Sequence, residues 1–179
     1  MAIYNDIDGR FVSLKSCSID DAEFTLSLRQ NPSIARFIPM VDGNIDKQIK
    51  WIKSQRIEEG DYFFVVWDKS GKRIGTLGLY NIEEGTAEAG RLVMNGNSLQ
   101  SLEAQILVFD FAFEVLKLKE VVSFIYFDNE RALRFSSQFG GIAEEPKVYK
   151  ENDRPMIKKH NTPETYYKAR IKLLRYLYR

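Results

Sequence analysis

The alternation of apolar and polar positions predicts a chain built from both strands and helices. Residues 61–67 form a β-rich run, 68–71 a polar turn and 73–80 a second β-rich run, which together predict an antiparallel hairpin. A further turn at 83–85 leads into a strand over 86–94. We therefore expect three antiparallel strands in succession in the middle of the chain.

The pattern then changes to alternating helices and strands. A polar loop at 95–101 precedes a long amphipathic run at 102–118, which predicts a helix. A strand over 121–127 and a helix over 128–141 follow, and a Gly-Gly pair ends that helix. Strands joined through a helix favour parallel pairing, so this half of the sheet is expected to contain a crossover.

The N-terminal part adds one strand and two helices. Residues 10–15 predict the strand, and Ser18 is suited to cap a helix over 20–30. After a short turn at 33–38, a second helix is expected over 44–59. The predicted fold class is α/β of the α+β type, with a mixed, mostly antiparallel central sheet flanked by helices.

The C-terminal part leaves two interpretations open. Residues 147–150 and 156–157 suit short strands. Apolar residues at helical spacing over 163–179 favour a helix that begins after Thr162-Pro163. The β-forming residues within 165–173 would equally suit an edge strand. We expect a strand running into a helix.

Length and charge narrow the class of protein. The chain has 179 residues, so we expect 1–179 to form one domain with its core in about 10–150 and an uncertain piece at 151–179. There are 26 basic and 25 acidic residues, a net charge of +1, which argues against a nucleic-acid partner. The basic-rich stretch 147–179 is interpreted as a solvated face, with an anion-binding edge as the alternative.

Rare residues and apolar runs exclude other classes. The single cysteine, Cys17, excludes an internal disulfide, and the single histidine, His160, is expected at the surface, so no metal site is predicted. No apolar run approaches the roughly 18 residues of a membrane span, and the first residues show no signal-peptide pattern. We expect a cytoplasmic protein without a membrane partner.

Two strand-to-helix junctions are the candidate binding site. The polar loop 95–101 opens a helix directly after a strand, and backbone N–H groups converge on anions at such a position. The junction 127–129 is expected in the same sheet with the same direction. Ligands of α/β folds usually bind at the carboxyl ends of neighbouring strands, so a phosphate-bearing small molecule is predicted between the two junctions.

Seven short motifs follow one another along the chain: Asp20-Asp21-Ala22-Glu23, Leu28 to Ile34, Lys47 to Trp51, Arg73 to Leu79, Ala87 to Arg91, Phe111 to Leu116, and Asp128 to Ala132. In this order they resemble the GNAT superfamily of N-acetyltransferases, and within it the ribosomal-protein-alanine and nucleotide-aminosugar branch. The resemblance covers about residues 10–150. The resemblance implies the GNAT-like acyl-CoA N-acyltransferase fold and acetyl-CoA as the co-substrate.

The resemblance also implies which residues would bind acetyl-CoA. Backbone N–H groups around Val93 and Met94 would polarise the thioester carbonyl. The loop would hold the pyrophosphate, although Leu99 stands where the family usually has a glycine, and otherwise the loop is only a helix cap. The implied cofactor-binding residues are Leu92, Val93, Met94, Asn97, Ser98, Leu99, Gln100, Ser101, Asn129 and Arg134.

Candidate chemistry is carried by a few side chains, each with a simpler alternative. Glu88 is the candidate base, directly or through a water, and would otherwise be an exposed strand carboxylate. Ser136, where many relatives have a tyrosine, would protonate the thiolate. Asn129 would hold pantetheine or only cap its helix, and Arg134 would reach a CoA phosphate or only face solvent. The residues assigned to the acceptor are Arg29, Phe37 and Tyr80.

The leading hypothesis is therefore an enzyme, an acetyl-CoA-dependent N-acetyltransferase that acts on the primary amine of a small molecule. A nucleotide-linked aminosugar is the favoured acceptor. The amino terminus of a protein, as in the ribosomal-protein type, is the alternative within the enzyme class. A non-catalytic GNAT-like binding module is the alternative outside it, and a homodimer would be compatible with each hypothesis.

Overall fold

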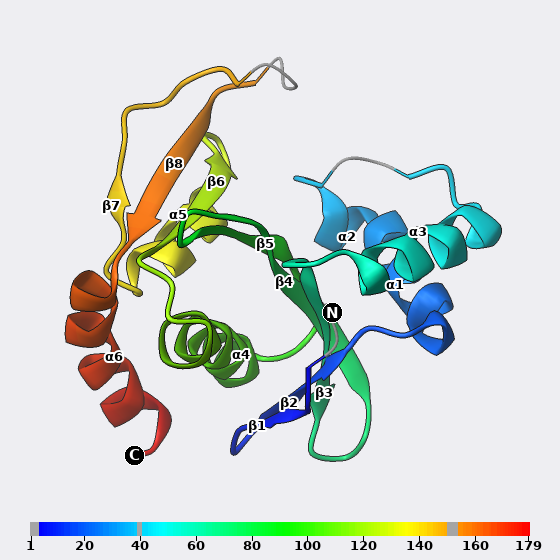
Figure 1. Cartoon of the computed structure of the whole chain (residues 1–179), viewed down its shortest axis with the longest axis horizontal. Coiled ribbons are helices and arrows are strands. Elements are labelled where there is room, and N and C mark those ends of the chain that lie inside the picture. The colour runs from blue at the N-terminus through cyan, green and yellow to red at the C-terminus, as the bar shows by residue number, and fades with distance from the viewer. Residues whose placement is uncertain (1–3, 39–40, 150–153) are drawn as a thin grey trace.

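One sheet of eight strands organises the part of the chain that the structure describes, residues 4–38, 41–149 and 154–179 of a computed structural model (Figure 1). The strand order is β1-β2-β3-β4-β5-β6-β8-β7. Within these residues, only the β5–β6 pair is parallel. The strands are β1 Ile7–Asp8, β2 Val12–Ser16, β3 Tyr62–Asp68, β4 Arg73–Glu83, β5 Thr86–Met94, β6 Glu120–Tyr126, β7 Ile142–Ala143 and β8 Met156–Asn161.

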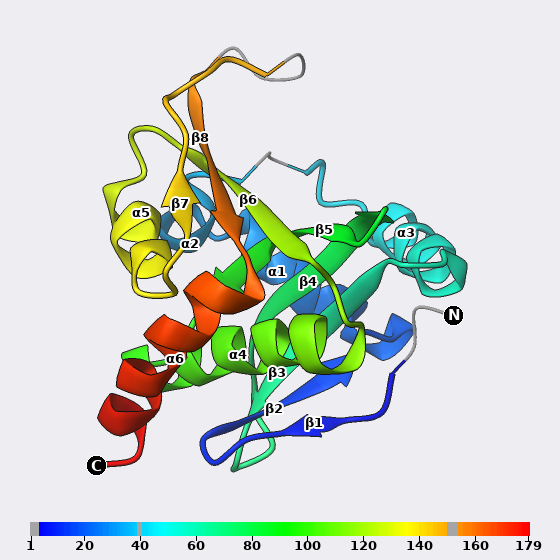
Figure 2. The ribbon, with the colours of Figure 1, turned by 60° about the vertical axis from the view of Figure 1, so that its left-hand side comes forward.

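Helices cover both faces of this sheet. Figure 2 shows α4 and α6 in front of the sheet and α1, α2 and α3 behind it. The π-helical turn η2 continues α4 without a break, and the 3-10 turn η1 leads into α1. The helical elements are η1 Ile19–Asp21, α1 Ala22–Gln30, α2 Pro32–Ala35, α3 Ile45–Ile57, α4 Ser98–Asp110, η2 Phe111–Val115, α5 Glu130–Ser137 and α6 Pro163–Leu177.

The period-two pattern of the strands divides the core between the two faces. In β3, Phe64 and Val66 belong to the large cluster that contains the apolar side of α4, whereas Phe63 and Val65 pack with Ile52 of α3. All five side chains are at most 5% exposed. Because alternate residues point to opposite faces, a strand that is apolar at every position is buried between two helical layers. The predicted mixed, mostly antiparallel sheet is confirmed.

Glu103 joins the middle of α4 to the N-terminal hairpin. Its carboxylate is fully buried and accepts hydrogen bonds from the backbone N–H groups of Arg10, Phe11 and Val12 at 2.6–2.8 Å. The Tyr178 hydroxyl donates a fourth hydrogen bond at 3.0 Å. Hydrogen bonds from several donors satisfy the carboxylate, which would otherwise be costly to bury.

Of the two interpretations left open for the C-terminal part, the helix is confirmed and the edge strand within 165–173 is wrong, because these residues lie inside α6. Thr162 caps the helix by accepting from the Thr165 N–H, and Pro163 occupies its first turn. Tyr166 is fully buried against α4, where its hydroxyl donates to Asp110 Oδ1 at 2.7 Å. The strand of this region is β8, which is longer than the predicted 156–157 and pairs with β6 along its whole length.

His160 of β8 is half-buried instead of lying freely at the surface. Its Nδ1 lies 2.8 Å from Glu120 Oε1 and its Nε2 lies 2.6 Å from Glu144 Oε1. Lys147 also donates to Glu144 at 2.9 Å. These contacts connect β6 and β8 to the segment that follows β7.

No helix in the described parts of the chain is long and apolar enough to cross a membrane.

Candidate active site

β5 and β6 lie side by side for only three residue pairs and then separate. The pairs are Thr86–Glu120, Ala87–Val121 and Glu88–Val122. Beyond Glu88, β5 continues to pair with β4 as far as Met94, whereas β6 continues beside β8. One edge of β5 is therefore left without a strand partner within the described chain, at the end of the sheet from which α4 and α5 begin.

A bulge in β5 shapes this edge. Between the Thr76–Val93 and Gly78–Gly90 pairs, β5 contains one more residue than β4. Arg91 takes up the extra length with a φ of +54° and its carbonyl accepts from the Thr76 hydroxyl at 2.9 Å. The bulge is thus held in place by a side chain of the neighbouring strand.

Strand alternation indicates which N–H groups of β5 face the open edge. The Asn95 N–H donates to the Ile74 carbonyl of β4 at 2.8 Å. Because successive N–H groups point to opposite sides of a strand, the Val93 N–H faces β4 as well. The N–H groups of Leu92 and Met94 then face the side from which β6 has separated. Of the three backbone positions predicted here, these two have the suitable direction.

Glu88 lies at the point where the two strands separate, and two neighbours fix its carboxylate. The Tyr80 hydroxyl donates to Oε1 at 2.9 Å and the Asn81 amide donates to Oε2 at 3.1 Å. Asn81 belongs to a second bulge and has a φ of +51°. Burial and then the negative charge of Glu88 raise the pKa of Tyr80, which keeps the hydroxyl protonated as a donor. A carboxylate has about four acceptor positions, so two remain for a ligand or a water.

Arg91, which the sequence-based assignment did not include, lies over the ring of Tyr80, the residue that donates to Glu88. Its guanidinium forms two hydrogen bonds with Asp61 and lies 4.0 Å from the centre of the Tyr80 ring. The rings of Trp51 and Phe63 lie 5.2 and 5.6 Å away. The sequence contains a signal that could have identified Arg91: Gly90 precedes it inside a strand, and a glycine within a strand often marks a bulge.

Arg29 of α1 lies on the same face of the sheet. Burial, followed by repulsion from Arg91, lowers the pKa of its guanidinium. An arginine remains charged under these conditions. Of the three residues assigned to the acceptor, Tyr80 thus contacts Glu88 directly, whereas Arg29 lies near Arg91, which packs on the Tyr80 ring. Phe37 lies near the carboxyl end of β6, with its ring 6.4 Å from the Tyr126 ring and 5.6 Å from the Arg154 guanidinium, so its assignment to the acceptor stays a prediction.

The loop before α4 contains a capping box. The Asn97 side chain accepts from the Gln100 N–H at 3.0 Å, and the Gln100 side chain accepts from the Asn97 N–H at 2.9 Å. The Ser101 hydroxyl turns back to the Asn97 carbonyl at 3.0 Å. Leu99 packs against the large apolar cluster, so its side chain points into the protein rather than out of the loop.

Two donors at the start of α4 remain available. In the described chain, the N–H groups of Ser98 and Leu99 have no protein acceptor. Gly96 is close to its neighbours, since a Cβ there would lie 2.7 Å from Gln100 Oε1. Free N–H groups and the helix dipole together favour a bound anion at this position.

At the second junction, one predicted residue caps α5 and two lie within it. The Asn129 side-chain oxygen caps the helix by accepting from the Ala132 N–H at 3.1 Å, which leaves its amide hydrogens for another partner. The Ser136 hydroxyl donates to the Leu133 carbonyl at 3.1 Å and accepts from Lys159 Nζ at 2.8 Å. Arg134 points to solvent, 76% exposed, and pairs with Glu130 at 3.6 Å.

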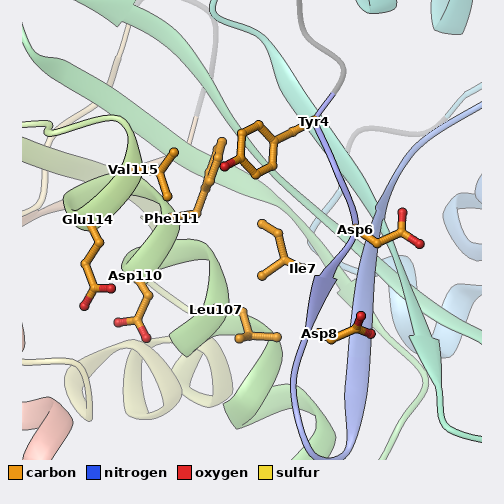
Figure 3. Close-up of a pocket in the computed structure, with 9 residues that line it drawn as sticks. All are labelled: Tyr4, Asp6, Ile7, Asp8, Leu107, Asp110, Phe111, Glu114 and Val115. Atoms are coloured by element: carbon orange, nitrogen blue, oxygen red, sulfur yellow. The ribbon is translucent and has the colours of Figure 1, made fainter.

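Two cavities lie outside the opening between β5 and β6. The larger, about 320 Å³, lies between β1 and α4 and has an acidic lining that includes Asp6, Asp8, Asp110 and Glu114 (Figure 3). Asp8 and Asp110 already have partners there, Ser13 and Arg170. The smaller, about 150 Å³, is lined by Trp51 and Asp61 among others and adjoins Arg91.

Comparison with known proteins agrees with this architecture. The family model described as an acetyltransferase (GNAT) domain matches residues 12–142. The chain therefore belongs to the GNAT acetyltransferase family and is an N-acetyltransferase. No curated protein matches it.

Solved structures show the same fold at low sequence identity. FdhC, a nucleotide-linked sugar GNAT, superimposes with a TM-score of 0.81 at 21% identity, over 98% of this chain and 99% of its own. A GCN5-related N-acetyltransferase from Brucella melitensis gives 0.79 at 20% identity, over 97% and 85%. A mutant of the spermidine N-acetyltransferase SpeG from Vibrio cholerae gives 0.75 at 15% identity, over 89% and 98%.

Proposed function

We propose that this protein transfers the acetyl group of acetyl-CoA to the primary amine of a small molecule that also carries a negative charge, with a nucleotide-linked aminosugar as the leading candidate. The observation that carries the proposal is the position of Glu88. A carboxylate fixed by two donors lies where β5 and β6 separate, next to the open edge of β5.

The residues around the opening fit acetyl-CoA. The N–H groups of Ser98 and Leu99 and the dipole of α4 would hold the pyrophosphate, with Ser101 nearby. The inward packing of Leu99 keeps the loop backbone accessible. The open edge of β5 would bind the pantetheine amides, and Asn129 would donate its free amide hydrogens. Arg134 is exposed and would meet only a phosphate at the rim of the site.

Each step of acetyl transfer has a candidate group. Glu88 takes a proton from the acceptor amine, directly or through a water. The N–H groups of Leu92 and Met94 donate to the carbonyl oxygen as negative charge develops on it. The Val93 N–H group faces β4 and does not take part in this step. Ser136 donates a proton to the sulfur that leaves when the carbon–sulfur bond breaks and the carbon–nitrogen bond forms.

The charge on the acceptor side favours an anionic acceptor. Arg29 and Arg91 lie close enough for their charges to interact, and Asp61 balances the charge of Arg91, so Arg29 is the cation assigned to the acceptor. A phosphate or carboxylate on the acceptor would be attracted to the Arg29 guanidinium. The amino terminus of a protein brings no anion of its own next to its amine, so it is the second candidate.

Calorimetric titration with acetyl-CoA and with CoA tests the first half of the proposal. Micromolar binding of both is expected. A panel of amines then tests the second half, with release of the CoA thiol as the measurement: a nucleotide-linked aminosugar, the same aminosugar without the nucleotide, a peptide with a free amino terminus, and spermidine. Turnover of the nucleotide-linked amine alone supports the proposal. If the protein did not bind acetyl-CoA at millimolar concentration, the proposed activity would be wrong and a non-catalytic GNAT-like module would remain. If only the peptide were acetylated, the acceptor would be a protein amino terminus instead of an aminosugar.

A further inference from the structure

Lys159 is a buried cation without a carboxylate partner. Its residue is 5% exposed, and it forms no ion pair within the described chain. Burial alone lowers the pKa of its ammonium group. A charged side chain in the interior is costly unless an anion or several hydrogen bonds compensate it. Lys159 has two acceptors, the Ser136 hydroxyl at 2.8 Å and the Leu133 carbonyl at 3.5 Å.

The alternation of β8 explains why this lysine faces inward. Lys159 lies between Ser123 of β6 and Ala143 of β7 in the sheet and points toward α5. Its neighbour Lys158 points to the opposite face, with Nζ 5.9 Å from the centre of the Phe124 ring. Ser123 and Ala143 carry no charge, and the charged residues Glu130 and Arg134 of α5 pair with each other at the surface. Among the described residues, no carboxylate therefore neutralises the ammonium group.

We propose that Lys159 acts through Ser136 as the source of the proton, and of the compensating positive charge, for the sulfur of CoA. This inference rests on the proposed function, in which Ser136 donates to that sulfur. When the thioester carbon–sulfur bond breaks, its electron pair stays on sulfur. The Ser136 hydroxyl gives its proton to sulfur, and Lys159 gives a proton to the Ser136 oxygen and is recharged from solvent. Lys159 is a positioning residue, since Ser136 stands between it and the sulfur.

The proposed role and a purely structural role of Lys159 predict different stabilities for a variant that lacks its charge. If Lys159 only supported the fold, its replacement by an apolar residue of similar length should destabilise the protein. If it is kept for a transient anion, the same replacement removes an uncompensated buried charge and should leave the melting temperature unchanged or higher. Ser136 would still donate to the Leu133 carbonyl in that variant.

The test measures the acidity of the thiol of bound CoA, and it needs no acceptor. Thiolate ultraviolet absorbance is followed against pH in the complex with CoA, and the complex with desulfo-CoA supplies the baseline for tyrosines and Cys17. In the wild-type complex the thiol should be about tenfold more acidic than in free CoA, since a nearby cation favours the anion. K159M should lose this difference, K159R should keep most of it, and S136A should reduce it, because the thiolate loses the hydrogen bond from the hydroxyl while the cation remains.

The control variant is K158M, which removes the neighbouring charge on the other face of β8 and should behave as the wild type. Equal thiol acidity in the wild type and K159M would overturn the inference, as would a K159M protein that melts well below the wild type. S136A with wild-type acidity would overturn the relay through the hydroxyl. If the wild-type protein did not bind CoA at all, the proposed function itself would be wrong. The titration of the wild type shows this outcome before any variant is made.

Discussion

Tyr80 and Glu88 face each other across the β4–β5 pair, and the phenol donates to the carboxylate at 2.9 Å. The Tyr80 hydroxyl also lies over Gly90, where a Cβ would come within 2.1 Å of the phenol oxygen. Gly90 thus makes room for the contact that orients the candidate base. Because its neighbours fix the position of Glu88, the first prediction concerns this residue and Tyr80.

Glu88→Gln should lower kcat for acetyl transfer by about 10²–10⁴, the range expected when a general base is removed. Affinity for acetyl-CoA should stay unchanged, since Glu88 serves the amine. Tyr80→Phe should lower kcat less, because it loosens the base without removing it. Calorimetry and initial rates measure the two effects, and a Glu88→Gln variant with wild-type kcat would return Glu88 to the role of an exposed strand carboxylate.

Ser98→Asp should separate helix stability from anion binding. A carboxylate in the first turn of α4 favours the helix by up to about 1 kcal/mol, so the melting temperature should not fall. The same charge opposes a pyrophosphate, and the Kd for acetyl-CoA should rise at least about tenfold. Ser98→Ala is the matched control, with little effect expected on either quantity. If Ser98→Asp bound acetyl-CoA as well as the wild type, the loop would be only a helix cap.

Arg29→Met should raise KM for an anionic acceptor with little change in kcat. A hydrogen bond to a charged group contributes about 1.5–3 kcal/mol, which corresponds to a KM about ten- to a hundredfold higher. An uncharged amine acceptor should lose much less. Initial rates with a nucleotide-linked aminosugar and with the sugar alone make the comparison. Equal losses with both acceptors would indicate that Arg29 supports α1 rather than the acceptor.

Glu103→Gln should destabilise the protein strongly, since an amide cannot accept at both positions that Glu103 uses. One terminal atom becomes a donor that faces backbone N–H groups of 10–12. The free energy of unfolding should fall by about 2–4 kcal/mol. Tyr178→Phe removes only the fourth donor and should cost about 1 kcal/mol. Urea unfolding measures both, and equal costs would mean that the backbone contacts contribute little.

Glu144 should contribute to stability against acid. Hydrogen bonds from Lys147 and then His160 lower the pKa of its carboxyl group from 4.5 to about 2. The folded protein therefore keeps this group ionised where the unfolded chain binds a proton, so its contribution is present above pH 4.5 and is lost as pH falls toward 2. In melting curves over that interval, Glu144→Gln should lose less stability than the wild type. Parallel curves would contradict this expectation.

Local patterns were sufficient to predict most of the fold. The strand over 86–94 has its predicted bounds, because β-forming residues follow the tight turn at Gly85, whose φ is +86°. Helix α3 was predicted within two residues at either end because Asn44 caps it. The choice between strand and helix within 165–173 stayed open because it has a tertiary cause: β-forming residues enter a helix there, with Tyr166 buried against α4.

The site was harder to predict because its key side chains depend on bulges and on strand direction. Arg91 reaches Asp61 and Tyr80 from a bulge that the sequence does not define in length. Lys159 lies in a stretch whose composition indicates a solvated basic face, and only its position in β8 turns it inward while Lys158 stays outside. The capping roles of Asn97 and Asn129, in contrast, follow from local residue type.

The short parallel pairing of β5 with β6 also has a consequence for how the protein behaves when substrate is scarce. The unpaired edge of β5 can template the addition of any extended peptide, including a segment of a partly unfolded second copy. Most sheets protect such edges with charges or prolines, but in the proposed function this edge stays open for acetyl-CoA. Acetyl-CoA should therefore act as a chemical chaperone for its own enzyme, and preparations stored with it should aggregate more slowly than those without.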